Sequence, residues 1–146
     1  MLFSKKRTLP SGSAAAASDK QITTKRRGDL AEALAAEYLA ARGLSLLQRN
    51  FKTPGRGGGE IDLIMRAPDG TLVFVEVRQR ASTSHGGAGA SITGVKQRRI
   101  IFAARHYLQR LASLPPCRFD VVLVQGASKL DDSPTIEWLQ SAFDAS

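Results

Sequence analysis

Two acidic side chains, Asp62 and Glu76, lie on neighbouring segments whose residue pattern is typical of a β-hairpin. The turn between the segments is Pro68-Asp69-Gly70, which favours a three-residue loop with proline starting a type I turn and a left-handed glycine closing it. This loop predicts a register in which Asp62 lies directly opposite Glu76. A two-residue loop at Asp69-Gly70 would turn the two carboxylates to opposite faces, because a one-residue slip reverses every side chain.

The other face of the same hairpin supports the three-residue loop. In that register this face becomes uniformly apolar, as expected for a hairpin that packs on a core. Its residues are Ile61, Leu63, Met65, Val73, Val75 and Val77. On the polar face Glu60 then lies opposite Arg78, beside the predicted pair of Asp62 and Glu76.

This pair of carboxylates predicts a metal site. Two carboxylates about 5 Å apart on one face repel each other, so a purely structural role would destabilise the hairpin. Mg²⁺ or Mn²⁺ between Asp62 and Glu76 would remove the repulsion, because these ions prefer oxygen ligands and keep several waters. Such an ion polarises a phosphoryl oxygen and lowers the pKa of a bound water, which is the chemistry of phosphodiester hydrolysis. The alternative is that both carboxylates are solvated and pair with Arg78 and Arg80.

The positive charge of the chain is unevenly distributed. The net charge is +8, of which residues 1–27 carry +6, from seven basic residues and one acidic residue. Between Glu76 and Asp120 there are eight basic residues and no acidic one, which predicts a basic face that attracts phosphate backbones. The candidate nucleic-acid contacts are Arg80, Lys96, Arg98 and Arg99. A charged face that only keeps the protein in solution is the alternative.

Hydrophobic spacing and chain breakers predict the elements that position these residues. Apolar residues at three- and four-residue spacing predict helices at 28–41, ended by Gly43, and at about 92–111. Short apolar runs predict strands at 44–50, 60–66, 71–80, 118–124 and, against a terminal helix, 136–138. The glycine-rich segment 53–59 is a loop that lacks the Gly-Lys-Ser/Thr ending of a P-loop. This order predicts an α/β sandwich, with a mixed central β-sheet flanked by helices.

The length fits one domain, and the composition excludes several classes of protein. Residues 1–24 show no periodicity and predict a disordered basic tail, and residues 25–146 are predicted to form a single domain. No run approaches the roughly 18 apolar residues of a membrane-spanning helix, so no membrane partner is expected. A lone Cys117 excludes an internal disulfide framework and favours a reducing, cytoplasmic location. Two histidines without metal-ligand spacing, His85 and His106, give no case for zinc.

Several motifs occur in order over residues 28–143: Gly28…Glu32…Ala35…Tyr38-Leu39, Glu60-Ile-Asp-Leu-Ile64, Val73-Phe-Val-Glu-Val-Arg78 and Arg118-Phe-Asp-Val-Val122. Together they resemble the YraN-like uncharacterised bacterial family, which is placed in the restriction-endonuclease-like superfamily with its Asp…(Asp/Glu)-x-Lys signature. The resemblance implies a restriction-endonuclease-like fold and metal ligation by Asp62 and Glu76. It also implies that a third acidic residue, Glu32, approaches the metal from the first helix.

One position departs from that signature. Arg78 stands where the lysine is expected, and arginine stays charged, so Arg78 cannot serve as a general base. It can still stabilise charge on the phosphorus. Lys96 matches a lysine found at this position in the family, which leaves three outcomes: catalysis is reduced, moves onto Lys96, or is lost. An ordinary surface lysine is the other interpretation of Lys96.

These observations predict a nuclease-like protein that binds nucleic acid, with DNA favoured over RNA and the choice between them left open, and that hydrolyses branched or single-stranded substrates with Mg²⁺ or Mn²⁺. Its predicted catalytic residues are Asp62, Glu76, Arg78 and Glu32. The alternative is a nucleic-acid-binding module of the same fold that has lost the chemistry. A third hypothesis is an assembly protein that docks an acidic partner, and a homodimer is left open because no motif specifies one.

Overall fold

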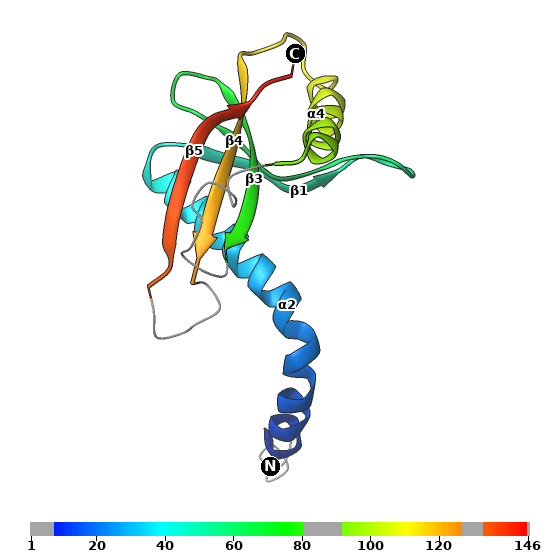
Figure 1. Ribbon diagram of the computed structural model, residues 1–146, viewed down its shortest axis with the longest axis vertical. Helices are drawn as coiled ribbons and strands as arrows, with labels where there is room; N and C mark the ends of the chain where they lie inside the picture. The colour runs from blue at the N-terminus through cyan, green and yellow to red at the C-terminus, as the bar shows by residue number, and fades with distance from the viewer. Residues whose placement is uncertain (1–7, 81–91, 127–132, 146) are drawn as a thin grey trace, which may run out of the picture.

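The computed structural model describes residues 8–80, 92–126 and 133–145, with side chains described from residue 24 onward (Figure 1). Its elements are helix α2 (Thr8–Ala41), strands β1 (Ser45–Lys52), β2 (Glu60–Arg66) and β3 (Leu72–Arg80), helix α4 (Gly94–Leu108), and strands β4 (Cys117–Gln125) and β5 (Thr135–Phe143). The predicted α/β class is confirmed, and the last segment is a strand rather than the alternative helix. His85 and residues 1–7 of the predicted tail lie outside the described residues.

The five strands form one mixed sheet in the order β1-β2-β3-β4-β5. Strands β1, β2 and β3 pair antiparallel, β3 and β4 pair parallel, and β4 and β5 again pair antiparallel. A parallel pair needs a crossover connection, and α4 lies on the connection between β3 and β4. The predicted mixed central sheet is therefore confirmed.

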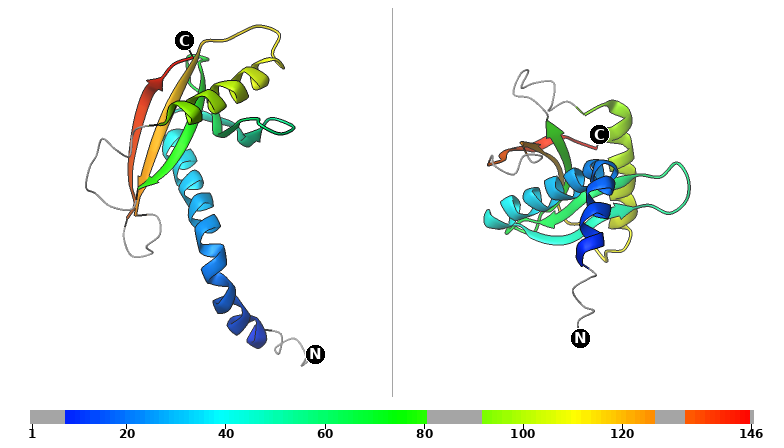
Figure 2. Two further views of the ribbon diagram at one scale, coloured as in Figure 1. Left: turned by 45° about the vertical axis from the view of Figure 1, so that its right-hand side comes forward. Right: turned by 90° about the horizontal axis from the view of Figure 1, so that it is seen from below.

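The two helices cover opposite faces of this sheet (Figures 1 and 2). Because successive side chains of a strand point to opposite faces, each face supplies its own apolar core. Helix α2 packs Ala31, Ala35 and Leu39 on one face, against Leu63, Met65, Val73, Val75, Val122 and Val124. Helix α4 packs Ile100, Ala103 and Ala104 on the other face, against Ile64, Phe74 and Phe119. Glu76 shares the strand face of Phe74 and is thus turned towards α4.

The hairpin of β2 and β3 has the register that its turn predicts. Leu63 pairs with Val75 and Ile64 pairs with Phe74, which confirms the three-residue loop. Gly70 adopts a left-handed conformation, with a φ of 92°. Glycine takes this conformation without the steric cost of a Cβ, so a local turn fixes which carboxylates of the two strands meet.

The pairing of β2 with β3 ends at Leu63, so the two strands are already separated at Asp62, one residue earlier in the chain. There the Val77 N–H donates to Asp62 Oδ2 at 2.8 Å, so a carboxylate replaces a backbone acceptor. This separation corrects one prediction, because Ile61 packs in the α4 core instead of on the face of Leu63 and Val75. The simple alternation that the prediction assumed does not hold beyond the end of the ladder to β3.

Helix α2 is longer than predicted. A disordered tail is predicted for residues 1–24, whereas the backbone is helical from Thr8 onward. The alanines at 14–17 have the highest helix propensity, and Pro10 falls in the first turn, where proline is tolerated. The early part of α2 extends away from the sheet (Figure 1), and the boundary between tail and domain at residue 25 stays a prediction. In the part of the chain that the structure describes, no helix has the length and apolarity needed to cross a bilayer.

Capping residues set the ends of the two helices that face the sheet. Gly43 follows α2 in a left-handed conformation, with a φ of 98°, and is the predicted C-cap. Helix α4 begins after Thr93, whose side chain accepts a hydrogen bond from the Lys96 N–H at 3.2 Å. It ends at Leu108, earlier than the predicted residue 111. The Thr93 cap thus places Lys96 in the first turn of the helix, which covers the face carrying Glu76.

Candidate functional site

The carboxylates of Asp62 and Glu76 meet where β2 and β3 separate. The two side chains are hydrogen-bonded to each other, and Asp62 Oδ2 also accepts the Val77 N–H at 2.8 Å. The Glu76 side chain is only 8% exposed to solvent. The structure therefore brings the predicted pair together, and Glu76 is not the solvated surface residue of the alternative interpretation.

The pair strongly resists carrying two negative charges. Burial and the nearby Asp62 carboxylate raise the pKa of Glu76 to about 8. Burial also raises the pKa of Asp62, although hydrogen bonds from the Val77 N–H and from Glu76 oppose that shift. The pair therefore retains a proton to a higher pH than two separate carboxyl groups would. A cation that binds here displaces this proton, because metal ligation requires both carboxylates in their ionised form.

Lys96 reaches the same pair from helix α4. Its Nζ lies 3.4 Å from Glu76 Oε2, and its charge lowers the pKa of both Glu76 and Asp62. The Lys96 side chain is 44% exposed, so it connects the carboxylate pair with the surface. The sequence leaves Lys96 open between a site residue and an ordinary surface lysine, and the structure puts it in contact with the carboxylate pair.

Glu32 approaches Asp62 from helix α2. Burial and the Asp62 carboxylate raise the pKa of Glu32, and its side chain is hydrogen-bonded to Asn50. Its Oε1 atom is buried without a hydrogen-bond partner among the described residues. Across the described ranges, no group of three His, Cys, Asp or Glu side chains is close enough to hold a metal ion. The structure thus joins two of the three predicted acidic residues and leaves Glu32 as a neighbour.

Asn50 belongs to this site, although the sequence does not single it out. It lies in β1 opposite Asp62, as the pairing of the adjacent residues shows, and its backbone is left-handed with a φ of 50°. This conformation is uncommon for a residue with a side chain, and asparagine tolerates it better than most. Its side chain holds Glu32 by a hydrogen bond. An asparagine at the end of a predicted strand is the available signal, and on its own it indicates only a strand end.

The predicted basic contacts fall into two groups. Arg80 forms an ion pair with Glu137, with 3.0 Å between Nη2 and Oε1, so its charge is matched within the fold. Arg98 and Arg99 are exposed on α4, where their charges face solvent. Arg78 is half-buried on the α4 face of β3. The exposed cations on α4 are therefore the better placed for an external anionic partner.

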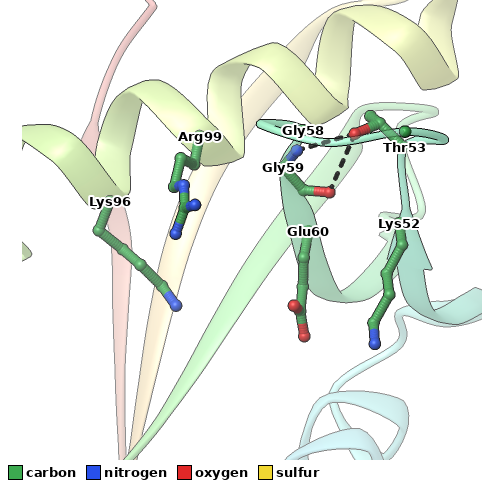
Figure 3. A pocket seen from close by; sticks show the side chains of 8 residues that line it. Lys52, Thr53, Gly58, Gly59, Glu60, Lys96 and Arg99 are labelled. Carbon is green, nitrogen blue, oxygen red and sulfur yellow. Dashed lines mark hydrogen bonds between the residues drawn. The ribbon is translucent and has the colours of Figure 1, made fainter.

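A cleft of about 210 Å³ lies between the glycine-rich loop and α4 (Figure 3). Its charged lining residues are Lys52, Glu60, Lys96 and Arg99, and the others are Thr53, Gly55, Gly58 and Gly59. Figure 3 shows the charged side chains projecting the same way from β1, β2 and α4. Lys96 lines this cleft and also lies 3.4 Å from Glu76, so the cleft and the carboxylate pair adjoin.

The chain is similar to members of an uncharacterised protein family. Residues 31–124 match the profile of Uncharacterised protein family UPF0102. A UPF0102 protein of Polaromonas naphthalenivorans is 67% identical over 153 aligned residues, covering 100% of both chains. One from another Polaromonas strain is 60% identical over 100% of both chains. A UPF0102 protein of Albidiferax ferrireducens is 66% identical over 84% of this chain and 91% of its own.

Proposed function

Because the chain belongs to Uncharacterised protein family UPF0102, whose name assigns no activity, we propose its function from the site itself. We propose a divalent-metal-dependent nuclease-like protein that hydrolyses phosphodiester bonds in branched or single-stranded nucleic acid, DNA rather than RNA. In this proposal the fold is of the restriction-endonuclease-like type, and the protein acts in the cytoplasm. The observation that carries the proposal is a pair of carboxylates, the buried Glu76 and the half-buried Asp62, with a lysine, Lys96, in contact with Glu76.

The donor atoms of the site fit Mg²⁺ or Mn²⁺. Both ions prefer oxygen ligands and retain waters, so two carboxylates suffice when waters complete the coordination shell. Asp62 and Glu76 would hold the ion, and the unpartnered Oε1 of Glu32 is a further buried acceptor near Asp62. Such an ion, when bound, polarises a phosphoryl oxygen and lowers the pKa of a coordinated water.

The side chains around the carboxylates have distinct parts in the proposed reaction. Lys96 attracts the phosphate to the carboxylate pair and, unlike arginine, can exchange a proton with the attacking water. It thereby takes the part of the signature lysine, whose place Arg78 occupies. Arg78 stays charged and stabilises the negative charge that develops around the phosphorus. Asn50 orients Glu32 through the hydrogen bond between their side chains.

Exposed cations on the surface supply affinity for the nucleic-acid backbone. Lys52, Arg98 and Arg99 are exposed on β1 and α4. Contacts of this kind release counterions from the nucleic acid, so binding weakens steeply as salt rises and depends little on base sequence. We therefore expect the substrate to be selected by its shape and by the access of a strand to the carboxylates.

A cleavage assay tests the proposed function directly. Purified protein is mixed with labelled duplex, flapped, branched and single-stranded DNA and RNA in Mg²⁺ or Mn²⁺. We expect Asp62→Ala and Glu76→Ala to lower cleavage on the order of 100-fold or more. Glu37→Ala is the matched control, because Glu37 is an exposed acid on α2, and it should cleave like the wild type. Cleavage that survives Asp62→Ala would show that another site or a contaminant is responsible.

A second function is a nucleic-acid-binding module that has lost catalysis, and Arg78 is the observation that favours it. Binding would then be salt-dependent, insensitive to chelators and free of cleavage products. Arg78→Lys separates the two functions, because it restores the signature lysine beside an otherwise unchanged pair. A gain of cleavage would identify an impaired catalyst. No cleavage by either the wild type or Arg78→Lys, in a protein that binds Mn²⁺, would favour the binding module.

A further inference from the structure

The cleft between the glycine-rich loop and α4 shares only Lys96 with the proposed chemistry. Three cations, Lys52, Lys96 and Arg99, and one carboxylate, Glu60, line it, which gives a formal charge of +2. We propose that this cleft is a pocket for a phosphate monoester at the end of a nucleic-acid strand. The proposal rests on the function proposed above and names the feature of the substrate that the protein recognises.

The charge of the cleft matches a dianion. A phosphate monoester carries close to two negative charges at neutral pH, whereas each phosphodiester of a strand carries one. Lys52 and Arg99 make no ion pair within the part of the chain that the structure describes, although Glu60 is the cross-strand neighbour of Lys52. Both cations are therefore able to contact an anionic ligand. Glu60 keeps the formal charge at +2, which favours a terminal phosphate over a more highly charged group.

The size and lining of the cleft also select a small group. Its volume of about 210 Å³ is below the roughly 300–1,000 Å³ of pockets that enclose drug-sized ligands. None of its lining residues is aromatic, so a base would find no stacking surface there. The cleft therefore suits a phosphate group better than a whole nucleotide.

The glycine-rich loop gives this pocket a fixed wall. The Thr53 N–H donates to Gly59 O at 3.0 Å. The Gly59 N–H donates to Thr53 Oγ1 at 2.8 Å, and the Thr53 hydroxyl donates to Gly59 O at 3.4 Å (Figure 3). A Cβ at Gly58 would collide with the Thr53 side chain, and a Cβ at Gly59 would collide with the Arg99 backbone. Glycine thus lets the loop lie directly against α4 without side chains that would fill the cleft.

Lys96 joins the pocket to the proposed cleavage site. Its ammonium group lines the cleft and lies 3.4 Å from Glu76 Oε2. A strand end held in the pocket therefore lies next to Asp62 and Glu76, and cleavage is directed to bonds close to a phosphorylated end. The absence of a P-loop sequence is consistent with this pocket, because its positive charge comes from side chains of β1 and α4.

Binding without metal tests the pocket independently of catalysis. The full chain is titrated in EDTA, at constant ionic strength, with oligonucleotides of one sequence that end in a 5′-phosphate, a 3′-phosphate or hydroxyl groups only. Inorganic phosphate is added separately as a competitor. We expect one phosphorylated end to bind about fivefold more tightly than the hydroxyl ends, which is the scale of one exposed charge pair, and inorganic phosphate to abolish the difference. Lys52→Ala and Arg99→Ala should remove this preference.

Arg98→Ala is the matched control, because Arg98 is the adjacent exposed cation of α4 and does not line the cleft. It should weaken all oligonucleotides equally and keep the preference. Equal binding of all ends to the wild type, or loss of the preference in Arg98→Ala, would overturn the pocket. A preference in a protein that cleaves nothing would overturn the proposed function alone. Cleavage without any end preference would overturn the pocket alone.

Discussion

Two buried acidic sites lie on the same sheet, and they differ in how their charge is matched. Asp120 on β4 is fully buried and receives four hydrogen bonds. Trp138 Nε1 and the Ser141 N–H donate at 2.9 Å each, and Arg118 Nε donates to both oxygens at 3.1 Å. Strand β5 bulges opposite Asp120, and the carboxylate binds the backbone of that bulge. Asp120 is therefore satisfied entirely within the fold.

The pair of Asp62 and Glu76 is the opposite case. Each carboxylate faces the other, and the cation in contact with them, Lys96, is 44% exposed. The result is a pKa of Glu76 raised to about 8. Burial of an acid is common to both regions, so burial alone does not identify a functional site. The difference is that Asp120 has donors for its charge, whereas the pair has a charge conflict that an external cation would resolve.

The largest expected effect is the loss of folding stability when Asp120 is replaced. Asp120→Ala leaves the Arg118 guanidinium and the Trp138 and Ser141 N–H groups without their acceptor, which destabilises the fold by about 3 kcal/mol. Asp62→Ala should cost much less, because it also removes the repulsion on Glu76. Urea unfolding of both variants in EDTA measures the two free energies of unfolding. Equal losses would contradict the distinction between a structural and a functional acidic site.

The second effect is the stabilisation of the folded chain by a cation that binds between Asp62 and Glu76. Mn²⁺ at about 100 times its Kd should stabilise the wild type by about 2.7 kcal/mol, because it binds the folded chain. Binding at pH 7 should also release protons, since the pair retains a proton in the absence of metal. Thermal unfolding and calorimetry in buffers of different ionisation enthalpy measure the two quantities. Asp62→Asn should abolish both signals, and Glu37→Gln should leave them intact.

The third effect is the change in the pH dependence of stability when Glu76 is replaced by a neutral residue. The pKa of Glu76 is raised above its ordinary value, so between about pH 5 and 8 the unfolded chain loses a proton that the folded chain keeps. The free energy of unfolding of the metal-free protein should therefore fall as the pH rises through this window and level off above it. Glu76→Gln should flatten this slope and be about 1–2 kcal/mol more stable than the wild type at pH 8. Unfolding series at several pH values in EDTA measure the slope.

Much of the candidate site follows from local sequence, because a turn fixes a register. Pro68-Asp69-Gly70 predicts the pairing of β2 with β3, and that pairing brings Asp62 to Glu76. Alternation and helical spacing likewise predict the order of elements and the mixed sheet. These features depend on residues close in the chain, where sequence patterns are informative.

Other features depend on how distant elements pack, and the sequence pattern does not contain that information. Lys96 meets Glu76 only because the first turn of α4 packs near the face of the sheet that carries Glu76. Ile61 changes face where β2 leaves its ladder, and Asn50 adopts its left-handed backbone beside the same point. The partners of Asp120 come from β5, whose bulge no alternation pattern predicts. Each of these is a tertiary effect that overrides a local preference.

The smallest expected effect measures how strongly Lys96 offsets the conflict in the pair. Lys96→Met keeps an unbranched side chain of similar length at this position and removes the charge. The pKa of Glu76 should therefore rise further in the metal-free protein. Because the Lys96 side chain is 44% exposed, solvent screens the interaction, and we expect it to be worth no more than about 1 kcal/mol. Carbon-13 NMR titration of the Glu76 carboxyl at low salt follows the shift directly. Arg98→Met removes a charge from the exposed side of the same helix and should move the titration much less. If both variants gave the same midpoint, Lys96 would act as one surface charge among several, and the pair of carboxylates would lack its specific cation.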